Sequence, residues 1–274
     1  MSGLVVVTGA STGIGLATAQ RLAGHGFDVL AGVRTAQAGE AIAAERITPV
    51  VVDVTDAGQV AALRATVGDR PLAGLVNNAG ISVSGALEFL DLDDFRRQLE
   101  VNLIGHVAVT QALIEALRAR PGRIVNTGSV GARTPLPFTA PYAASKAALW
   151  ATGEALRGEL RPWGIHVATV EPGAIATPIW EKGTAQAAGA AARLPPRGQE
   201  LYGSTLDRVD DIVATVTASA IAPEKVAEVV EEALTARRPK ARYLVGSDAR
   251  QQVLARRLLG HRRFDALLAR RMGL

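Results

Sequence analysis

A tyrosine and a lysine stand four residues apart at Tyr142 and Lys146, with only small residues between them. The apolar run that follows the pair is typical of a helix that begins here. Residues four apart on a helix lie on one face, about 6 Å from each other along the axis. A nearby ammonium favours a phenolate and lowers the phenol's pKa from its usual value of about 10. The spacing therefore predicts an acid/base pair.

A glycine-rich turn near the start of the chain could hold a phosphate. The stretch TGASTGIG at residues 8–15 follows an apolar run and opens a helical pattern. Glycines let the backbone turn sharply and approach a pyrophosphate, whose charge the N–H groups of a helix N-terminus stabilise. A tight strand-to-helix connection is the alternative interpretation. The position after the first strand favours a dinucleotide site, formed by Gly9, Ser11, Thr12, Gly13, Ile14 and Gly15.

The end of the second apolar run bears on which dinucleotide binds. NAD sites of this type usually carry an acid here, whereas a basic residue suits the 2′-phosphate of NADP. Arg34 occupies this position with Thr35 beside it, so we expect NADP rather than NAD, unless Arg34 is an ordinary exposed arginine. Asp53, followed by Val54, ends the third run. Asp53 either accepts a hydrogen bond from the adenine amino group or caps the helix that begins after Thr55.

The elements that would position these groups alternate along the chain. Seven apolar runs predict strands at 4–9, 28–33, 48–54, 72–78, 122–128, 165–170 and 241–246. Helical patterns lie at 13–26, 56–68, 91–120, 141–161 and 223–238. The runs are nearly continuous, as expected of strands buried on both faces of a parallel sheet. We therefore expect one α/β domain over residues 1–247, a doubly wound, Rossmann-type sheet of seven parallel strands flanked by helices.

Two stretches fall outside this alternation. Residues 178–220, rich in Ala, Gly and Pro, predict a long irregular insertion that serves as a substrate lid, with a disordered segment as the alternative. Residues 250–274 carry seven Arg and one Asp, a charge of +6, which leaves −2 on the rest of a chain whose net charge is +4. We expect a basic amphipathic helical tail over 248–274 that is solvated or faces a partner, with peripheral contact to an anionic membrane as the alternative.

The composition excludes several other classes of protein. Cysteine is absent, which rules out disulfides and fits a reducing compartment. The four His are isolated in the sequence, so no metal site is expected, and a tail with one Phe does not predict nucleic-acid binding. The first residues lack the pattern of a secretory signal, and no apolar run reaches the roughly 20 residues of a spanning helix. We expect a soluble, cytoplasmic protein.

Six motifs recur in the order and spacing of one known family. They are TGxxxGxG at 8–15, NNAG at 77–80, Asn102 in VNLIG, Ser129 in GSVGA, YxxxK at 142–146 and PGAIAT at 172–177. Over residues 3–247 the chain resembles the classical short-chain dehydrogenases/reductases. Its GVR ending of the second strand and its C-terminal RYLVGSDAR look most like the subgroup of hydroxysteroid and retinol dehydrogenases.

The resemblance implies a role for each motif. Tyr142 would be the acid/base, and Lys146 would tune it and bond the nicotinamide ribose. Ser129 would hydrogen-bond the substrate oxygen as charge develops there. Asn102 would hold a water that links Lys146 to solvent. Two turns would complete the cofactor site, with Asn78, Ala79 and Gly80 in the first and Pro172, Gly173, Ile175 and Thr177 in the second.

These roles imply that a hydride moves between a nicotinamide and the carbon of a small-molecule alcohol or ketone. Apolar side chains of the predicted lid and of the loop at 131–141 favour a hydrophobic substrate such as a steroid or retinoid: Leu136, Phe138, Ile179, Trp180, Leu194, Leu201 and Tyr202. The helices at 91–120 and 141–161 resemble those through which the family dimerises, so a homodimer or homotetramer is expected. The alternatives are an NAD-dependent dehydrogenase and a cofactor-sensing protein without turnover.

Overall fold

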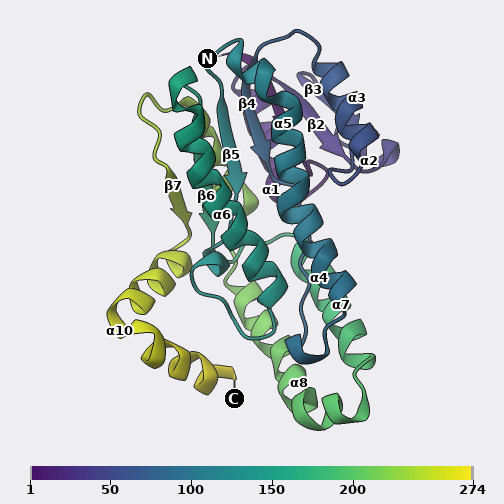
Figure 1. Ribbon diagram of the computed structural model, residues 1–274, viewed down its shortest axis with the longest axis vertical. Coiled ribbons are helices and arrows are strands. Elements are labelled where there is room, and N and C mark those ends of the chain that lie inside the picture. The colour runs from purple at the N-terminus through teal and green to yellow at the C-terminus, as the bar shows by residue number, and fades with distance from the viewer. Residues whose placement is uncertain (1, 273–274) are drawn as a thin grey trace.

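A seven-stranded parallel sheet with helices on both faces forms the centre of the computed structural model, which describes residues 2–272 (Figure 1). The strands lie in the order β3-β2-β1-β4-β5-β6-β7. The order reverses between β1 and β4, and ligands of such sheets bind at this switch point. The predicted doubly wound sheet is confirmed. Its strands are β1 (Gly3–Val7), β2 (Phe27–Val33), β3 (Ile47–Val51), β4 (Leu72–Asn77), β5 (Arg123–Thr127), β6 (His166–Pro172) and β7 (Arg242–Val245).

Burial on both faces explains why the strands are continuous apolar runs. Successive side chains of a strand point to opposite faces, so Val5 and Val7 of β1 belong to one core cluster and Leu4 and Val6 to the other. Helices α1 (Gly13–Gly24) and α9 (Pro223–Thr235) cover the first face. Helices α3 (Ala57–Val67), α5 (Gly105–Arg118) and α6 (Ala140–Leu160) cover the second, and α5 and α6 stand in front of the sheet in Figure 1. A short α2 (Ala36–Glu40) follows β2.

The helix predicted over 91–120 is divided. Helix α4 (Leu92–Leu99) passes into a π-helical turn over Glu100–Ile104, and α5 follows it directly. Such π turns often mark functional sites because the extra residue redirects the side chains of the turn. Here the turn contains Asn102, which is fully buried.

The prediction that residues 178–220 are irregular is wrong, because they fold mainly as two helices. These are α7 (Ile179–Ala192) and α8 (Pro196–Ala218), which pack on each other beyond the carboxyl ends of the strands (Figure 1). Alanine is the strongest helix former, so an Ala-rich stretch becomes helical despite its scattered glycines. Residues 193–195 separate the two helices, and Pro196 occupies the first turn of α8, where proline is tolerated. The role of residues 178–220 as a substrate lid stays a prediction.

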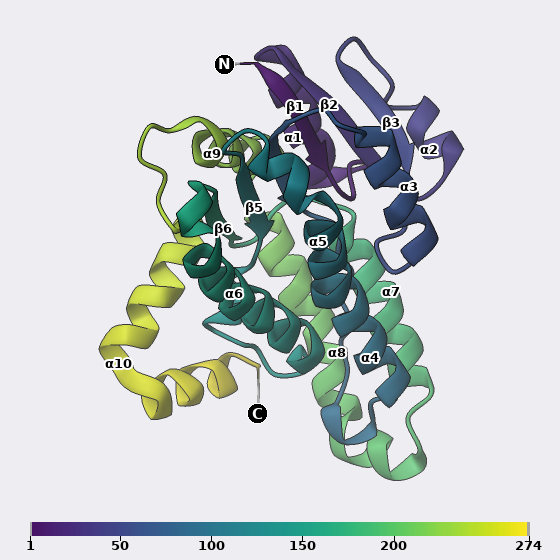
Figure 2. The ribbon, with the colours of Figure 1, turned by 45° about the horizontal axis from the view of Figure 1, so that its top comes forward.

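The C-terminal segment is helical, as expected. Helix α10 (Ser247–Met272) is broken at Gly260, whose φ of 68° and ψ of 174° are not helical, and its two halves meet at a sharp bend (Figure 2). The second half turns back far enough to bury Phe264, which is 3% exposed, whereas Leu258 before the bend is 73% exposed. Among the described residues, none of the helices combines the length and the apolar character that crossing a membrane requires.

Candidate active site

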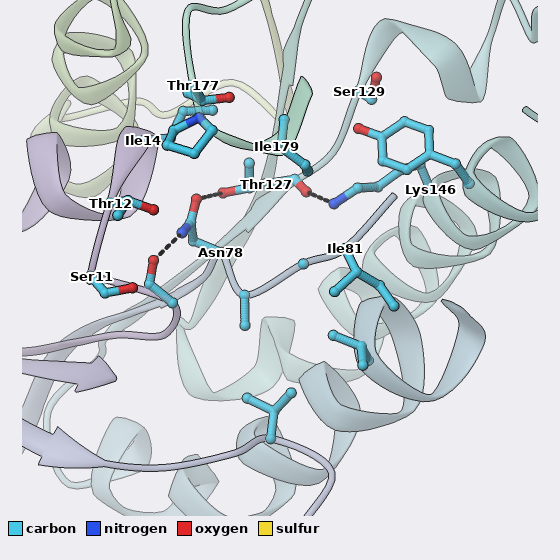
Figure 3. A pocket seen from close by; sticks show the side chains of 18 of the residues that line it. Ser11, Thr12, Ile14, Asn78, Ile81, Thr127, Ser129, Lys146, Thr177 and Ile179 are labelled. Carbon is cyan, nitrogen blue, oxygen red and sulfur yellow. Dashed lines mark hydrogen bonds between the residues drawn. The ribbon is translucent and has the colours of Figure 1, made fainter. Parts of the chain in front are cut away.

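A cleft of about 520 Å³ opens where the strands end. Many of its lining residues directly follow β1 to β6, as expected for the ligand site of a parallel α/β sheet, and helices α4, α6 and α7 supply others. In Figure 3, Ser11 and Thr12 lie on one side of the pocket and Ser129 and Lys146 on the other. Most of the predicted site residues line it: Gly9, Ser11, Thr12, Gly13, Ile14, Arg34, Asp53, Val54, Asn78, Ala79, Gly80, Ser129, Tyr142, Lys146, Pro172, Gly173, Ile175 and Thr177.

The glycine turn between β1 and α1 is shaped for close approach. Gly9 and Gly13 have φ values of +64° and +56°, a region that side chains other than glycine rarely adopt. Gly15 does not line the cleft but packs behind it, where an added Cβ would clash with the Gly9 carbonyl oxygen. Thr12 precedes α1 without a capping side-chain hydrogen bond, so the first N–H groups of the helix remain available to an anion.

The end of the cleft beside β2 and β3 carries positive charge around one carboxylate. Asp53 accepts hydrogen bonds from the N–H and hydroxyl groups of Thr55, at 2.9 and 2.7 Å, and these bonds lower the pKa of Asp53. The charges of Arg34 and Arg97 lower it further. Arg97 belongs to α4 and lines the cleft, and sequence reasoning missed it because two adjacent arginines are typical of a solvated helix surface.

Two predictions concern the roles of Asp53 and Thr35 at this end of the cleft. Asp53 does not cap α3, because Asp56 occupies the capping position and accepts from the Gln59 N–H at 3.0 Å. Thr35 is not among the residues that line the cleft, and its hydroxyl caps α2 by accepting from the Ala38 N–H at 3.2 Å; its help to Arg34 stays a prediction. The capping interpretation of Asp53 is therefore wrong, and the adenine interpretation stays a prediction.

The turn after β4 is held from both sides. The Asn78 amide donates to the carbonyl oxygens of Thr8 and Gly9, at 3.1 Å each, and so ties β4 to the glycine turn. His106 was not predicted as a site residue; its Nε2 lies 2.6 Å from the Ala79 carbonyl oxygen. Burial, together with the charge of Lys146, lowers the pKa of His106 to about 3, so the imidazole is neutral and donates this hydrogen bond.

Helix α6 brings Tyr142 and Lys146 into the cleft on one face, as predicted. Lys146 is 4% exposed, and its Nζ donates to the Thr127 carbonyl oxygen at 2.7 Å (Figure 3). The Nζ lies 5.8 Å from the centroid of the Tyr142 ring. Burial lowers the pKa of Lys146 to about 8. Burial also raises the pKa of Tyr142, while the Ser129 hydroxyl acts in the opposite direction. This direction is opposite to the lowered phenol pKa expected from the spacing, because burial removes the solvation that a phenolate needs.

Ser129 follows β5 and faces the same end of the cleft. Its Oγ accepts a hydrogen bond from the Gly131 N–H at 3.0 Å, which fixes the oxygen while leaving its proton to donate. The hydroxyl can therefore donate to an oxygen atom bound beside Tyr142.

Asn102 lies behind the cleft and does not line it. Its amide oxygen accepts from the Ile81 N–H at 2.9 Å, and its amide nitrogen donates to the Ile81 carbonyl at 3.0 Å and to Ser145 Oγ at 3.2 Å. Ser145 in turn donates to the Tyr142 carbonyl at 2.7 Å. Asn102 thus connects the turn after β4 to helix α6, and its predicted water-holding role stays a prediction.

The turn Pro172–Thr177 carries an available donor at Ile175. The N–H groups of Gly173, Ala174 and Ala176 donate to β7, to α10 and to Ile221, two residues before α9. Among the hydrogen bonds of residues 2–272, the Ile175 N–H takes part in none, so it is free to bind a ligand carbonyl.

Two of the predicted substrate-pocket residues, Ile179 and Trp180, line the cleft, and the Trp180 indole donates to the Ile175 carbonyl at 2.7 Å. Phe138 and Tyr202 instead form an edge-to-face cluster with Phe89, with ring centroids 6.0 Å apart. The remaining three, Leu136, Leu194 and Leu201, do not line the cleft.

A buried ion cluster supports this end of the site from behind, and sequence reasoning missed it. Glu171, the residue before Pro172, is fully buried. Its carboxylate binds the guanidinium groups of Arg133, at 2.9 Å, and of Arg242 on β7. Arg242 also stacks on the Trp150 ring, 4.2 Å from its centroid. The cluster links β6, β7 and the segment after Ser129, and an isolated Glu in an apolar run gives no sign of such a contact.

A glycine turn at the switch point of a doubly wound sheet, facing a tyrosine–lysine pair, defines an oxidoreductase that binds a nicotinamide dinucleotide. The family model described as short chain dehydrogenase matches residues 3–188, and the chain belongs to that family.

Two relatives and one solved structure are similar to the chain. Retinol dehydrogenase 5 of Mus musculus is 36% identical over 96% of this chain and 87% of its own length. The 17-beta-hydroxysteroid dehydrogenase type 6 of Bos taurus is 36% identical over 89% of this chain and 81% of its own. A short chain dehydrogenase from Burkholderia cenocepacia J2315, solved in complex with NADP, superposes with a TM-score of 0.73 at 29% identity, covering 98% and 97% of the two chains. The predicted subgroup is confirmed.

Proposed function

We propose that the chain is an NADP(H)-dependent oxidoreductase that moves a hydride between nicotinamide and a hydrophobic alcohol or ketone. The observation that carries this proposal is the convergence of Ser129, Tyr142 and Lys146 with the glycine turn in one cleft. The nicotinamide would supply the hydride chemistry, and the chain would supply orientation and the proton. The free N–H groups at the start of α1 and at Ile175 suit a pyrophosphate and a carboxamide respectively.

Tyr142 is the proton-transfer group of the proposed reaction. Burial keeps its phenol protonated, so it is ready to donate to a ketone oxygen during reduction. During oxidation the phenol must first lose its proton, which the positive charge of Lys146 favours. Ser129 would donate a second hydrogen bond to the same substrate oxygen as its charge grows.

Tyr142→Phe tests the proposal directly. The variant keeps the ring but removes the acid, so we expect kcat to fall by about 10³-fold for any ketone reduced by the wild type, because acid/base catalysis contributes about 10² to 10⁴. The affinity for NADPH, measured by protein fluorescence, should change by less than about threefold, because only one hydroxyl group is lost. Unchanged kcat would contradict the proposal. Tight NADPH binding without turnover by the wild type, across a broad panel of carbonyl compounds and alcohols, would favour a cofactor-sensing protein.

Positive charge supports NADP over NAD. Arg34 stands where a basic residue suits a 2′-phosphate, and Arg97 adds a second cation near Asp53. The Burkholderia relative solved with NADP is similar over almost its whole length. An NAD-dependent dehydrogenase remains the alternative, and the cofactor preference of an Arg34→Asp variant distinguishes the two.

The apolar side chains of Ile179 and Trp180 in the cleft support a hydrophobic substrate, as do the names of the two relatives. We also propose a cytoplasmic homodimer or homotetramer, which light scattering and cell fractionation test. A screen of ketones and aldehydes that follows the absorbance of NADPH would identify the substrate class.

A further inference from the structure

The first turns of α10 lie against the turn Pro172–Thr177. Asp248 Oδ2 accepts a hydrogen bond from the Ala174 N–H at 2.8 Å. A Cβ added to Gly173 would clash with the same carboxylate, so the lack of a side chain at Gly173 is what admits Asp248. The tail of the chain therefore reaches the nicotinamide end of the cleft.

The same helix contacts the segment that follows Ser129. Gln252, one turn after Asp248, accepts from the Thr134 hydroxyl at 3.1 Å, and Thr134 is itself buried. Ala249, between them, is fully buried. One turn of α10 thus touches both segments that flank this end of the cleft.

Ala174 is anchored through both of its backbone groups. Its N–H is held by Asp248, and its carbonyl oxygen accepts from the Ile221 N–H at 3.1 Å. The Ala174 carbonyl and the free Ile175 N–H belong to one planar peptide, so fixing the first group fixes the direction of the second. A hydrogen bond to a carboxylate is about twice as strong as one between neutral groups.

We propose that Asp248 is a positioning residue that holds the turn Pro172–Thr177 in the shape that presents the Ile175 N–H to a nicotinamide carboxamide. The inference rests on the proposed function, because it assigns α10 to the same cofactor site. With this role for Asp248, the residues that form the cofactor site extend beyond residue 247 into the predicted tail.

The test compares two ligands that differ only in the nicotinamide. The affinities of NADPH and of 2′-phospho-ADP-ribose, which lacks that group, are measured by calorimetry for the wild type and for Asp248→Ala. We expect NADPH to bind about tenfold more weakly to the variant, a factor that corresponds to one lost charge-assisted hydrogen bond. The affinity for 2′-phospho-ADP-ribose should stay within about twofold of the wild type, because Asp248 contacts only the nicotinamide end.

Two further variants complete the comparison. Asp265→Ala is the matched control, since Asp265 is an exposed aspartate on the same helix, and it should leave both affinities unchanged. Asp248→Asn keeps an oxygen that can accept from Ala174, so it should recover most of the NADPH affinity. A merely structural role would weaken both ligands equally in Asp248→Ala, and that result would overturn the inference, as would the absence of any effect.

Hydrogen exchange on the unliganded wild type gives a second test that needs no variant. The Ala174 amide should be protected, and fast exchange there would also overturn the inference. A wild type that binds neither NADPH nor NADH would contradict the proposed function, and this result differs from every result that overturns the role of Asp248 alone. A wild type that prefers NADH is tested with NADH and ADP-ribose in the same way.

Discussion

At the scale of single residues, the sequence predicts the side chains that could do chemistry. It does not predict the buried side chains that hold the neighbouring turns in place. Tyr142, Lys146 and Ser129 stand in motifs whose order along the chain carries information, and all three line the cleft. His106 and Glu171 act only through contacts with segments far away in the sequence, on Ala79 and Arg242. No local pattern distinguishes such residues from ordinary members of a helix or strand.

Arg34→Asp tests the choice of cofactor. The substitution removes the cation proposed to bind the 2′-phosphate and places an acid where NAD sites carry one, so the preference for NADPH should fall by at least about tenfold. The ratio of the NADPH and NADH dissociation constants measures this. Arg263→Asp makes the same charge change at an exposed position of α10 and should leave the ratio unchanged. An unaltered ratio in Arg34→Asp would mean that Arg34 does not contact the phosphate.

Burial of the charged Lys146 lowers the stability of the folded chain. Its folded pKa of about 8 lies below the ordinary value of 10.5, so between these pH values the unfolded chain binds more protons than the folded one. The contribution of Lys146 to stability therefore rises with pH across that window, and its cost is fully present below about pH 8.

Lys146→Met removes the buried charge. We expect this variant to be more stable than the wild type at pH 7 by about 2 kcal/mol, less than the roughly 3 kcal/mol equivalent of the pKa shift because the bond to Thr127 is lost too. The gain should shrink towards pH 10. Urea unfolding at several pH values measures it, with the exposed Lys225→Met as control. A variant less stable than the wild type at pH 7 would contradict the prediction.

At the scale of elements, the strands were predictable and the helices of residues 178–220 were not. Short continuous runs of β-branched residues are typical of buried strands, so the sequence predicts all seven strands. A stretch rich in Ala, Gly and Pro carries conflicting signals, and packing decided for the helices α7 and α8. The π-helical turn at Glu100–Ile104 accompanies tertiary contacts of Asn102. The spacing of apolar residues along the sequence does not predict such contacts.

Two glycines of α1 allow the effect of close packing on stability to be distinguished from the effect of helix propensity. An alanine Cβ at Gly15 would clash with the Gly9 carbonyl and lie 2.5 Å from the Asn78 amide nitrogen, whereas nothing lies within 4 Å of one at Gly24. We expect Gly15→Ala to lower the free energy of unfolding by about 2 kcal/mol. Gly24→Ala should raise it by up to about 1 kcal/mol. Urea denaturation measures both, and equal effects would contradict this account of the turn.

At the scale of the whole molecule, binding of cofactor and folding are linked. The cleft joins segments that follow six strands, so a ligand bound there stabilises only the folded chain. At a concentration 100 times the dissociation constant, NADPH should add about 2.7 kcal/mol and raise the melting temperature by about 5 to 10 °C. A thermal melt with and without NADPH measures the shift. No shift at saturating NADPH would contradict the proposed site.

The supports of the nicotinamide end arrive late in synthesis. Arg242 and Asp248 lie among the last 33 residues of a chain of 274, yet they hold Glu171 and Ala174, which the ribosome makes some 70 residues earlier. A nascent chain that has not yet released β7 and α10 has its glycine turn but not the supports opposite it. If the proposed function holds, such a chain would bind the adenosine half of a dinucleotide before it could orient the reactive half, so redox competence would come only after β7 and α10 have left the ribosome.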